Sequence, residues 1–225
     1  MSALDTLRGG LVVSVQAEAA SELNTPETIA LLCRVAVANG AVGVRVEGLA
    51  RIAAARRAVA VPVIGLVKRP YAGFAPYITP GERELAEVAA AGAALVAFDA
   101  TGRARPDGRD VAAVVAGIHG RGLLAVADCA TTDDVRAALE AGADVLATTL
   151  CGYTEATRGT PLPAFDLVRA CAAAGRFTIC EGGIGSPDDV RSAFAAGADA
   201  AVVGTALTNV DALVRRFAAA APHAG

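Results

Sequence analysis

The stretch AAGAALVAFDAT, residues 90–101, carries the pattern that decides the fold. It begins in the last turn of a helical pattern, passes through Gly92-Ala93, and then becomes a continuous apolar run. The same order of features occurs at Gly40-Ala41, Gly142-Ala143 and Gly197-Ala198, at intervals of 52, 50 and 55 residues. Glycine suits the left-handed position that closes a helix. The repeat therefore predicts four similar units in which a helix ends just before a strand.

Around these repeats, eight short apolar runs are each followed by a stretch of helical periodicity. The runs cover residues 11–16, 44–47, 61–68, 94–101, 123–129, 145–150, 178–181 and 200–207. Continuous rather than alternating hydrophobicity is typical of parallel strands that are buried on both faces. Four pairs of residues have the composition of a helix start: Thr25-Pro26, Thr79-Pro80, Thr132-Asp133 and Ser186-Pro187. Strands and helices are thus expected to alternate along the chain.

Eight strands in four similar units favour one α/β domain over residues 1–225, a (β/α)8 TIM barrel of the phosphate-binding type. The alternative is an open, doubly wound sheet of the Rossmann kind. No G-x-G-x-x-G motif follows the first apolar run, which argues against that alternative.

The composition excludes several classes of protein. Hydrophobic residues make up 54% of the 225, which is too many for a disordered chain. The net charge is −3 and aromatic residues are only 4%, so we expect no nucleic-acid partner. The N-terminal residues lack the apolar core of a signal peptide, and no apolar stretch of membrane-spanning length is free of charge. We therefore expect no membrane partner.

The five cysteines are an odd number without CxxC spacing, which fits neither a disulfide framework nor a zinc ribbon. They indicate reduced thiols in a cytoplasmic protein. The two histidines, His119 and His223, lie in a helical stretch and in the C-terminal tail. Neither histidine is placed to serve in a Ser-His-Asp triad or in a histidine metal site, and we expect no metal.

In a barrel of this kind the reactive groups project from the carboxyl ends of the strands. Lys68 ends the third apolar run and is the only lysine in the chain; every other basic side chain is arginine. A lysine in a partly desolvated pocket can have its pKa lowered enough to exchange protons or to form a Schiff base, whereas arginine cannot. We therefore expect Lys68 to be catalytic, the alternative being a solvated lysine in a loop.

Glu181 ends the seventh run, on the side of the strand shared with Ile179 and opposite to Cys180. Its carboxylate is therefore expected to face the mouth of the barrel, either as a second catalytic group or as an ionic partner of Arg45 or Lys68. The same alternation of sides directs Gln16, Arg45 and Asp128 to the mouth of the barrel. Each of them is likewise expected either to act in the site or to serve only a structural role.

Glycine-rich turns follow the last two runs. Gly182 and Gly183 follow the seventh run, and Gly204 and Thr205 follow the first part of the eighth. In many barrels these two loops bind phosphate through exposed backbone N–H groups. They predict a small phosphorylated substrate, although glycine can also serve only to make the turns. The 69–80 segment, with Tyr71, Phe74 and Tyr77, is long for a connection and is either a lid over the mouth or a packed loop.

Taken together, the residues at the strand ends resemble those of the N-acetylmannosamine-6-phosphate 2-epimerases of bacterial sialic acid catabolism. The matching segments are GGLVVSVQ (9–16), VRVEG (44–48), PVIGLVKR (62–69), DAT (99–101), RARP (103–106), ADC (127–129), TTLCGYT (148–154), EG (181–182) and VGTA (203–206). The resemblance implies a barrel that interconverts N-acetylmannosamine 6-phosphate and N-acetylglucosamine 6-phosphate without a cofactor. It implies that Lys68 and Glu181 carry the proton transfers and that Gln16, Arg45 and Asp128 hold the sugar.

From the matching segment 148–154, the resemblance also implies that Thr149 and Tyr153 bind substrate. The reaction expected is removal of the C2 proton and its return on the opposite face. Two alternatives remain at this point: a Schiff-base aldolase acting on a sugar phosphate, since a lone desolvated lysine suits that chemistry too, and an inactive barrel that only binds a sugar phosphate. We expect a homo-oligomer, a dimer.

The chain departs from the family's pattern at three positions. Gly183 stands where the family usually has arginine or lysine, and Asn209 stands where it often has arginine. Both missing cations are ones that would bind phosphate, so phosphate binding would depend on backbone N–H groups. Pro70 replaces the family's aspartate after Lys68-Arg69, which concerns the 69–80 segment more than the chemistry.

Overall fold

The computed structural model describes residues 2–222, so His223 lies outside the described residues. The strands are β1 (Gly10–Val15), β2 (Gly43–Glu47), β3 (Val63–Leu66), β4 (Leu95–Asp99), β5 (Leu124–Asp128), β6 (Val145–Ala147), β7 (Phe177–Glu181) and β8 (Ala200–Val203). The helices are α1 (Ala3–Leu7), α2 (Pro26–Ala38), α3 (Leu49–Ala58), α4 (Glu82–Ala90), α5 (Val111–His119), α6 (Thr132–Glu140), the 3-10 turn η1 (Glu155–Thr157), α7 (Phe165–Ala173), α8 (Pro187–Ala195), α9 (Thr205–Thr208) and α10 (Val210–Ala218).

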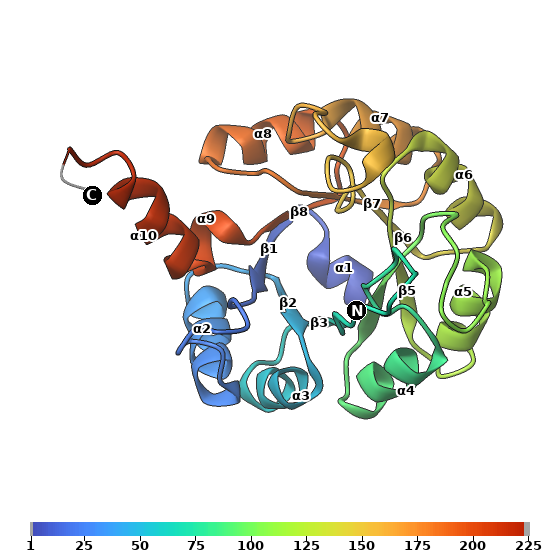
Figure 1. Ribbon diagram of the computed structural model, residues 1–225, viewed down its shortest axis with the longest axis horizontal. Helices are drawn as coiled ribbons and strands as arrows, with labels where there is room; N and C mark the ends of the chain where they lie inside the picture. Colours follow the sequence, from blue (N-terminus) through green and yellow to red (C-terminus); the bar gives the residue numbers. More distant parts are fainter. Residues whose placement is uncertain (1, 223–225) are drawn as a thin grey trace.

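The eight strands form a closed parallel barrel in sequence order, and the pairing of β1 with β8 closes it. Figure 1 shows helices arranged in a ring around the strands, while α10 projects away from the ring. The prediction of a (β/α)8 TIM barrel is confirmed, and the open doubly wound sheet is excluded.

Several strands are shorter than the apolar runs that predicted them. The run 61–68 contains only the four residues of β3, and the run 145–150 contains only the three of β6. The apolar pattern continues past the last paired residue because side chains there are still buried, as at Val67 (5% exposed) and Leu150 (1% exposed). As a result, Lys68 and Thr149 lie in the loops just beyond the strands.

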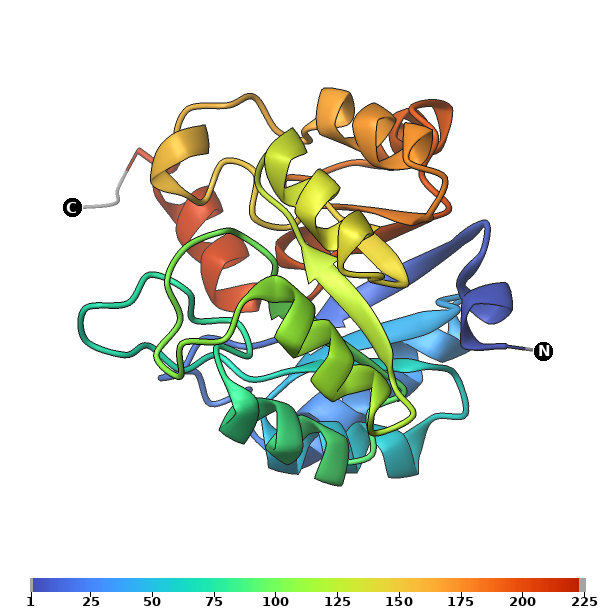
Figure 2. The same cartoon turned by 90° about the vertical axis from the view of Figure 1, so that its right-hand side faces the viewer.

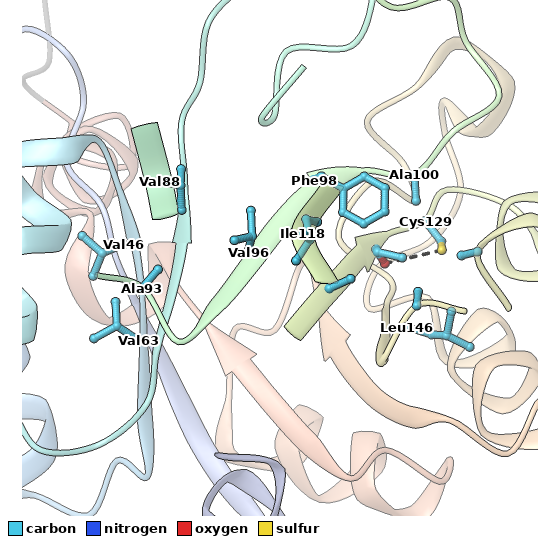
Figure 3. Packing of buried hydrophobic residues seen from close by; sticks show 14 of the residues in the cluster. Val46, Val63, Val88, Ala93, Val96, Phe98, Ala100, Ile118, Cys129 and Leu146 are labelled. Atoms are coloured by element: carbon cyan, nitrogen blue, oxygen red, sulfur yellow. Dashed lines mark hydrogen bonds between the residues drawn. The ribbon is translucent and has the colours of Figure 1, made fainter. Parts of the chain in front are cut away.

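Side chains pack in two layers, one inside the barrel and one between the strands and the helices. The interior cluster includes Val12, Ile64, Val126 and Ile179 from four different strands. Leu7 of α1 joins this cluster, and Figure 2 shows α1 at the end of the barrel opposite the 69–80 segment. The outer layer, part of which is drawn in Figure 3, packs residues such as Val96 and Phe98 of β4 against Ile118 of α5.

The helix ends follow the repeat found in the sequence. Gly40, Gly92, Gly142 and Gly197 have φ of 99°, 84°, 82° and 102°, the left-handed conformation predicted for them. In the unit of Gly142, the next N–H, that of Ala143, donates back to the Ala138 carbonyl at 3.0 Å. This bond closes the helix and directs the chain into the following strand.

Two of the four predicted helix starts are confirmed: Thr25 and Ser186 accept hydrogen bonds from N–H groups of the first turn. A third is shifted by one residue, because Thr131 rather than Thr132 caps α6. The prediction at Thr79 is wrong. Its hydroxyl donates to the Ala97 carbonyl at 2.7 Å, which ties the 69–80 segment to β4, and Gly81 precedes α4 instead.

No helix within residues 2–222 combines the length and the apolar character needed to cross a bilayer.

Candidate active site

A cavity of about 820 Å³ opens at the carboxyl ends of the strands. It is lined by ten of the residues expected in the site: Gln16, Arg45, Lys68, Thr149, Tyr153, Glu181, Gly182, Gly183, Gly204 and Thr205. Asp128 is fully buried and does not line the cavity; it lies beneath it, where it contacts Arg45 and Thr149. The structure therefore brings the predicted set together, with Asp128 as a supporting group.

At the base of the cavity is a buried charge network centred on Arg45, whose side chain is only 2% exposed. Its two terminal nitrogens donate to the two carboxylate oxygens of Asp128, at 3.0 and 2.7 Å. The Arg45 Nη1 atom also lies 2.9 Å from Glu181 Oε2. A bidentate pair of this kind fixes the plane of the guanidinium and so the position of Glu181.

Thr149 connects the two carboxylates of the network. Its hydroxyl lies 2.7 Å from Asp128 Oδ1 and 3.2 Å from Glu181 Oε2. Since it has one proton to donate, it serves one carboxylate at a time. Although burial alone would lower the pKa of Arg45, the carboxylates of Asp128 and Glu181 raise it, so Arg45 stays charged. Two carboxylates therefore share one permanent cation.

Glu181 lies at the end of β7 with Ile179 in the barrel interior and Cys180 in the outer layer, as the alternation of sides predicts. Burial raises the pKa of Glu181 to about 7, against the opposing effect of the Arg45 cation. Its carboxyl group therefore changes protonation near neutral pH, which a group that takes and returns protons requires.

Lys68 is the second residue after β3, and its side chain lines the cavity. Its ammonium nitrogen donates to Gln16 Oε1 at 2.6 Å, and the Gln16 amide nitrogen donates to Ser14 Oγ at 2.7 Å. The surrounding protein atoms and the Arg45 cation lower the pKa of Lys68, partly offset by nearby carboxylates, of which Glu47 has the largest effect. The Lys68 residue is exposed to solvent and lines the open cavity.

The two glycine-rich loops present unused donors to the same cavity. Within residues 2–222, the backbone N–H groups of Gly182, Gly183, Gly204 and Thr205 have no hydrogen-bond partner. Gly183 has φ of 74°, and a Cβ atom there would lie 2.4 Å from Leu162 Cβ. Leu162 thus occupies the space that a side chain at position 183 would need. A larger residue at position 183 would therefore require Leu162 to move.

Sequence reasoning did not assign four further residues that line the cavity: Glu47, Arg51, Tyr77 and Arg216. Glu47 was visible as a polar strand end, but nothing in the pattern distinguished it from a surface carboxylate. Tyr77 belongs to the 69–80 segment, which is fastened along the rim by backbone pairing of Lys68 with Ile78. Arg216 is brought to the cavity by α10, far from any strand end, so no strand-end argument could have found it.

The thiols take no part in this site as nucleophiles. All five cysteines are free and buried. Burial raises the pKa of Cys171 to about 12 and that of Cys180 to about 11, so the reactive thiolate is disfavoured. Within the part of the chain that the structure describes, no group of three His, Cys, Asp or Glu side chains is arranged to hold a metal ion.

Comparison with known proteins agrees with this geometry. A family model described as "NanE: Putative N-acetylmannosamine-6-phosphate epimerase" matches residues 29–223. A relative from Synechococcus elongatus, named "Putative N-acetylmannosamine-6-phosphate 2-epimerase", is 44% identical over 221 residues, covering 96% of this chain and 95% of its own. One from Haemophilus ducreyi with the same name is 38% identical, covering 97% and 94%.

A solved structure of the N-acetylmannosamine-6-phosphate 2-epimerase from Clostridium perfringens has a TM-score of 0.94 and 32% identity to this chain, covering 98% of it and 97% of its own length. Identity at this level over nearly the whole chain, with the same barrel, leaves one conclusion. The chain belongs to the N-acetylmannosamine-6-phosphate 2-epimerase family.

Proposed function

We propose that the protein interconverts N-acetylmannosamine 6-phosphate and N-acetylglucosamine 6-phosphate, with Lys68 and Glu181 as the two groups that move the C2 proton. The observation that carries the proposal is that both side chains line one cavity and that both have pKa values displaced by their surroundings. The pKa of the base Lys68 is lowered and that of the acid Glu181 is raised, so the difference between the two pKa values is smaller than usual.

The chemistry starts from the open-chain sugar, in which C2 lies next to the C1 carbonyl. In one direction, neutral Lys68 takes the C2 proton as the C2–H bond breaks, and the electron pair moves into an enolate on O1. Protonated Glu181 then donates its proton to the opposite face of C2, and the carbonyl re-forms. The pair ends as ammonium and carboxylate, which is the starting state for the reverse direction. Exchange of protons between each of the two groups and water resets the enzyme, and no redox cofactor is needed.

The remaining site residues hold the substrate or the catalytic pair. Gln16 contacts Lys68 directly, which supports a role for it beside C2 and the acetamido group. Arg45 and Thr149 reach both the cavity and Glu181, and Asp128 fixes Arg45 from below. Tyr153 is 59% exposed at the rim, where a bound sugar would cover it.

For the phosphate, we propose the loops of Gly182-Gly183 and Gly204-Thr205. Four unpartnered N–H groups on residues that line one cavity suit a dianion. A phosphorylated amino sugar is accordingly the substrate we propose, acted on in the cytoplasm by a single barrel domain of residues 1–225.

We also propose a homodimer. The outer face of α10 exposes Val210, Val214 and Phe217, which are 48, 60 and 75% exposed and lie one helical turn apart. An apolar stripe of this length is uncommon on a monomer, and a second copy related by twofold symmetry would present the same stripe to it.

Proton NMR in deuterated buffer tests the reaction. With N-acetylmannosamine 6-phosphate, we expect conversion to the other epimer with one deuterium at C2. Conversion without deuterium, or exchange without conversion in the wild-type protein, would contradict the mechanism. Borohydride added during turnover should leave no sugar attached to Lys68; an adduct there would point to a Schiff-base aldolase instead.

A further inference from the structure

Four side-chain cations line the cavity among the residues that the structure describes: Arg45, Arg51, Lys68 and Arg216. A phosphate dianion is recognised most strongly where backbone N–H groups act together with a side-chain cation. The glycine at position 183 and the asparagine at 209 supply no such cation. The question is therefore which of the four is free to do so.

Three of these cations are already engaged. Arg45 is paired with Asp128 and Glu181. The Arg51 guanidinium pairs with Glu47 and also donates to Asn24 Oδ1 at 2.8 Å. Lys68 bonds Gln16 and is needed for proton transfer. Withdrawing any of them to meet a phosphate would break a contact that it already makes within the site.

Arg216 differs from these three, because within residues 2–222 it makes neither a hydrogen bond nor an ion pair. It lines the cavity together with Ala212 and Leu213, neighbours on one face of α10, so this face of the helix looks onto the site. Two other contacts of α10 hold the helix in place. Arg215 pairs with Glu18, and the Asn209 side chain caps the first turn by accepting from the Ala212 N–H at 2.9 Å.

We propose that Arg216 is the side-chain cation for the 6-phosphate of the substrate, and that it sets the preference for phosphorylated over free sugar. The inference rests on the proposed function. In this arrangement Asn209 also has a role, although it carries no charge. It caps the first turn of α10 and so orients the helix, whose second turn carries Arg216. The anion is then met by N–H groups of two loops and by one guanidinium from α10.

The test compares N-acetylmannosamine 6-phosphate with N-acetylmannosamine in the wild-type protein, Arg216→Gln and Arg216→Lys. Loss of a charged hydrogen-bond partner lowers kcat/KM for the phosphorylated sugar roughly 10- to 100-fold in Arg216→Gln. The value for the free sugar stays within about twofold, since that substrate has nothing for Arg216 to bind. Arg216→Lys keeps the charge and recovers part of the loss.

Arg136→Gln is the control: it removes an exposed arginine of α6 that pairs with Asp133 and does not line the cavity, and it leaves both values unchanged. Equal losses on the two sugars in Arg216→Gln, or no loss on either, would overturn the inference. Calorimetric binding of N-acetylglucosamine 6-phosphate gives a readout that does not depend on turnover. If the wild-type protein binds it but catalyses nothing, the proposed reaction fails while weaker binding by Arg216→Gln still supports the role of Arg216; unchanged binding refutes it.

Discussion

At the scale of single residues, the site depends on Arg45, which is buried between two carboxylates at the base of the cavity. Taking these charges out of water is costly, and only the close bidentate geometry with Asp128 offsets the cost. Such a network positions Glu181 rigidly, because Glu181 cannot move without breaking its ion pair. The Glu181 carboxyl group is thus held in place by the same network of contacts that holds Arg45 and Asp128.

Asp128→Ala should therefore lower the free energy of unfolding by about 3–5 kcal/mol, because it leaves a buried arginine with half of its partners. Urea unfolding followed by circular dichroism measures the change. The control is Asp166→Ala, which breaks the exposed pair with Arg169 and should cost less than about 1 kcal/mol. A loss at Asp128 no larger than in the control would mean that the network contributes little to stability.

The pH dependence of kcat/KM reports the shared proton of Lys68 and Glu181. The active enzyme carries one proton on the pair, so activity falls when both groups are protonated and when both are deprotonated. Since the pKa of Glu181 is raised to about 7, activity should fall as the pH drops through about 7. The alkaline fall should lie below the ordinary pKa of lysine, because that of Lys68 is lowered.

Both directions of the reaction should give the same bell-shaped profile, since their ratio is the equilibrium constant. The phosphate group itself titrates near pH 6. Repeating the profile with N-acetylmannosamine, which has no phosphate, controls for that. An acid fall near pH 4 with the free sugar would show that Glu181 is not the group that titrates.

At the scale of elements, glycine closes the helices and delivers the chain to the next strand. Gly142 has φ of 82°, and a Cβ atom there would have open space around it. Gly142→Ala should therefore isolate the strain of a left-handed alanine and lower the free energy of unfolding by about 1–2 kcal/mol.

Gly102→Ala is the matched control, because Gly102 also has open space but does not have a left-handed φ. Its stability should not fall, since alanine restricts only the unfolded chain. The same urea experiment measures both variants. Equal effects in the two would mean that backbone strain does not close the helix.

These element-scale features are also what the sequence predicted best. The Gly-Ala repeat and the continuous apolar runs follow from local physics, so they fixed the number, the order and the sides of the strands. Strand ends were less predictable, because burial at Val67 and Leu150 extends beyond the backbone pairing. The prediction that Thr79 caps a helix was wrong for a related reason. Its hydroxyl donates to the Ala97 carbonyl, which is distant in sequence, and does not cap the helix that follows.

The site was predictable wherever a residue's position in a strand determined its direction. Glu181, Arg45 and Lys68 follow from strand ends and, for Lys68, from its being the sole lysine. Arg216 could not be predicted in this way, since the path of α10 after the barrel closes depends on tertiary contacts such as the pair of Arg215 and Glu18.

At the scale of the whole molecule, the barrel has the cavity at one end and is closed at the other by α1. Gly43 permits this closure, because a Cβ atom there would lie 2.4 Å from Leu7 Cδ2. The C-terminal helix α10 differs from the other α-helices in having no buried residue. One of its faces lines the cavity and the other is an exposed apolar stripe.

Light scattering coupled to size-exclusion chromatography should give a mass of about 45 kDa, twice the 22.4 kDa of one chain. Phe217→Asp puts a charge into the stripe and should shift the mass toward that of the single chain. Phe217→Leu keeps the stripe apolar and should leave the dimer intact. A wild-type protein that runs as a single chain at micromolar concentration would contradict the proposed assembly.

The most direct test of the two-base mechanism is C2 exchange in deuterium oxide, measured by NMR on each epimer separately with Lys68→Met and Glu181→Gln. Each variant keeps one group, which can still remove the C2 proton that faces it and return deuterium to the same face. We predict that neither variant interconverts the epimers at more than a small fraction of the wild-type rate, and that each exchanges one epimer only, the two variants choosing opposite ones. Near wild-type epimerisation by Lys68→Met, or exchange of the same epimer by both variants, would contradict the account.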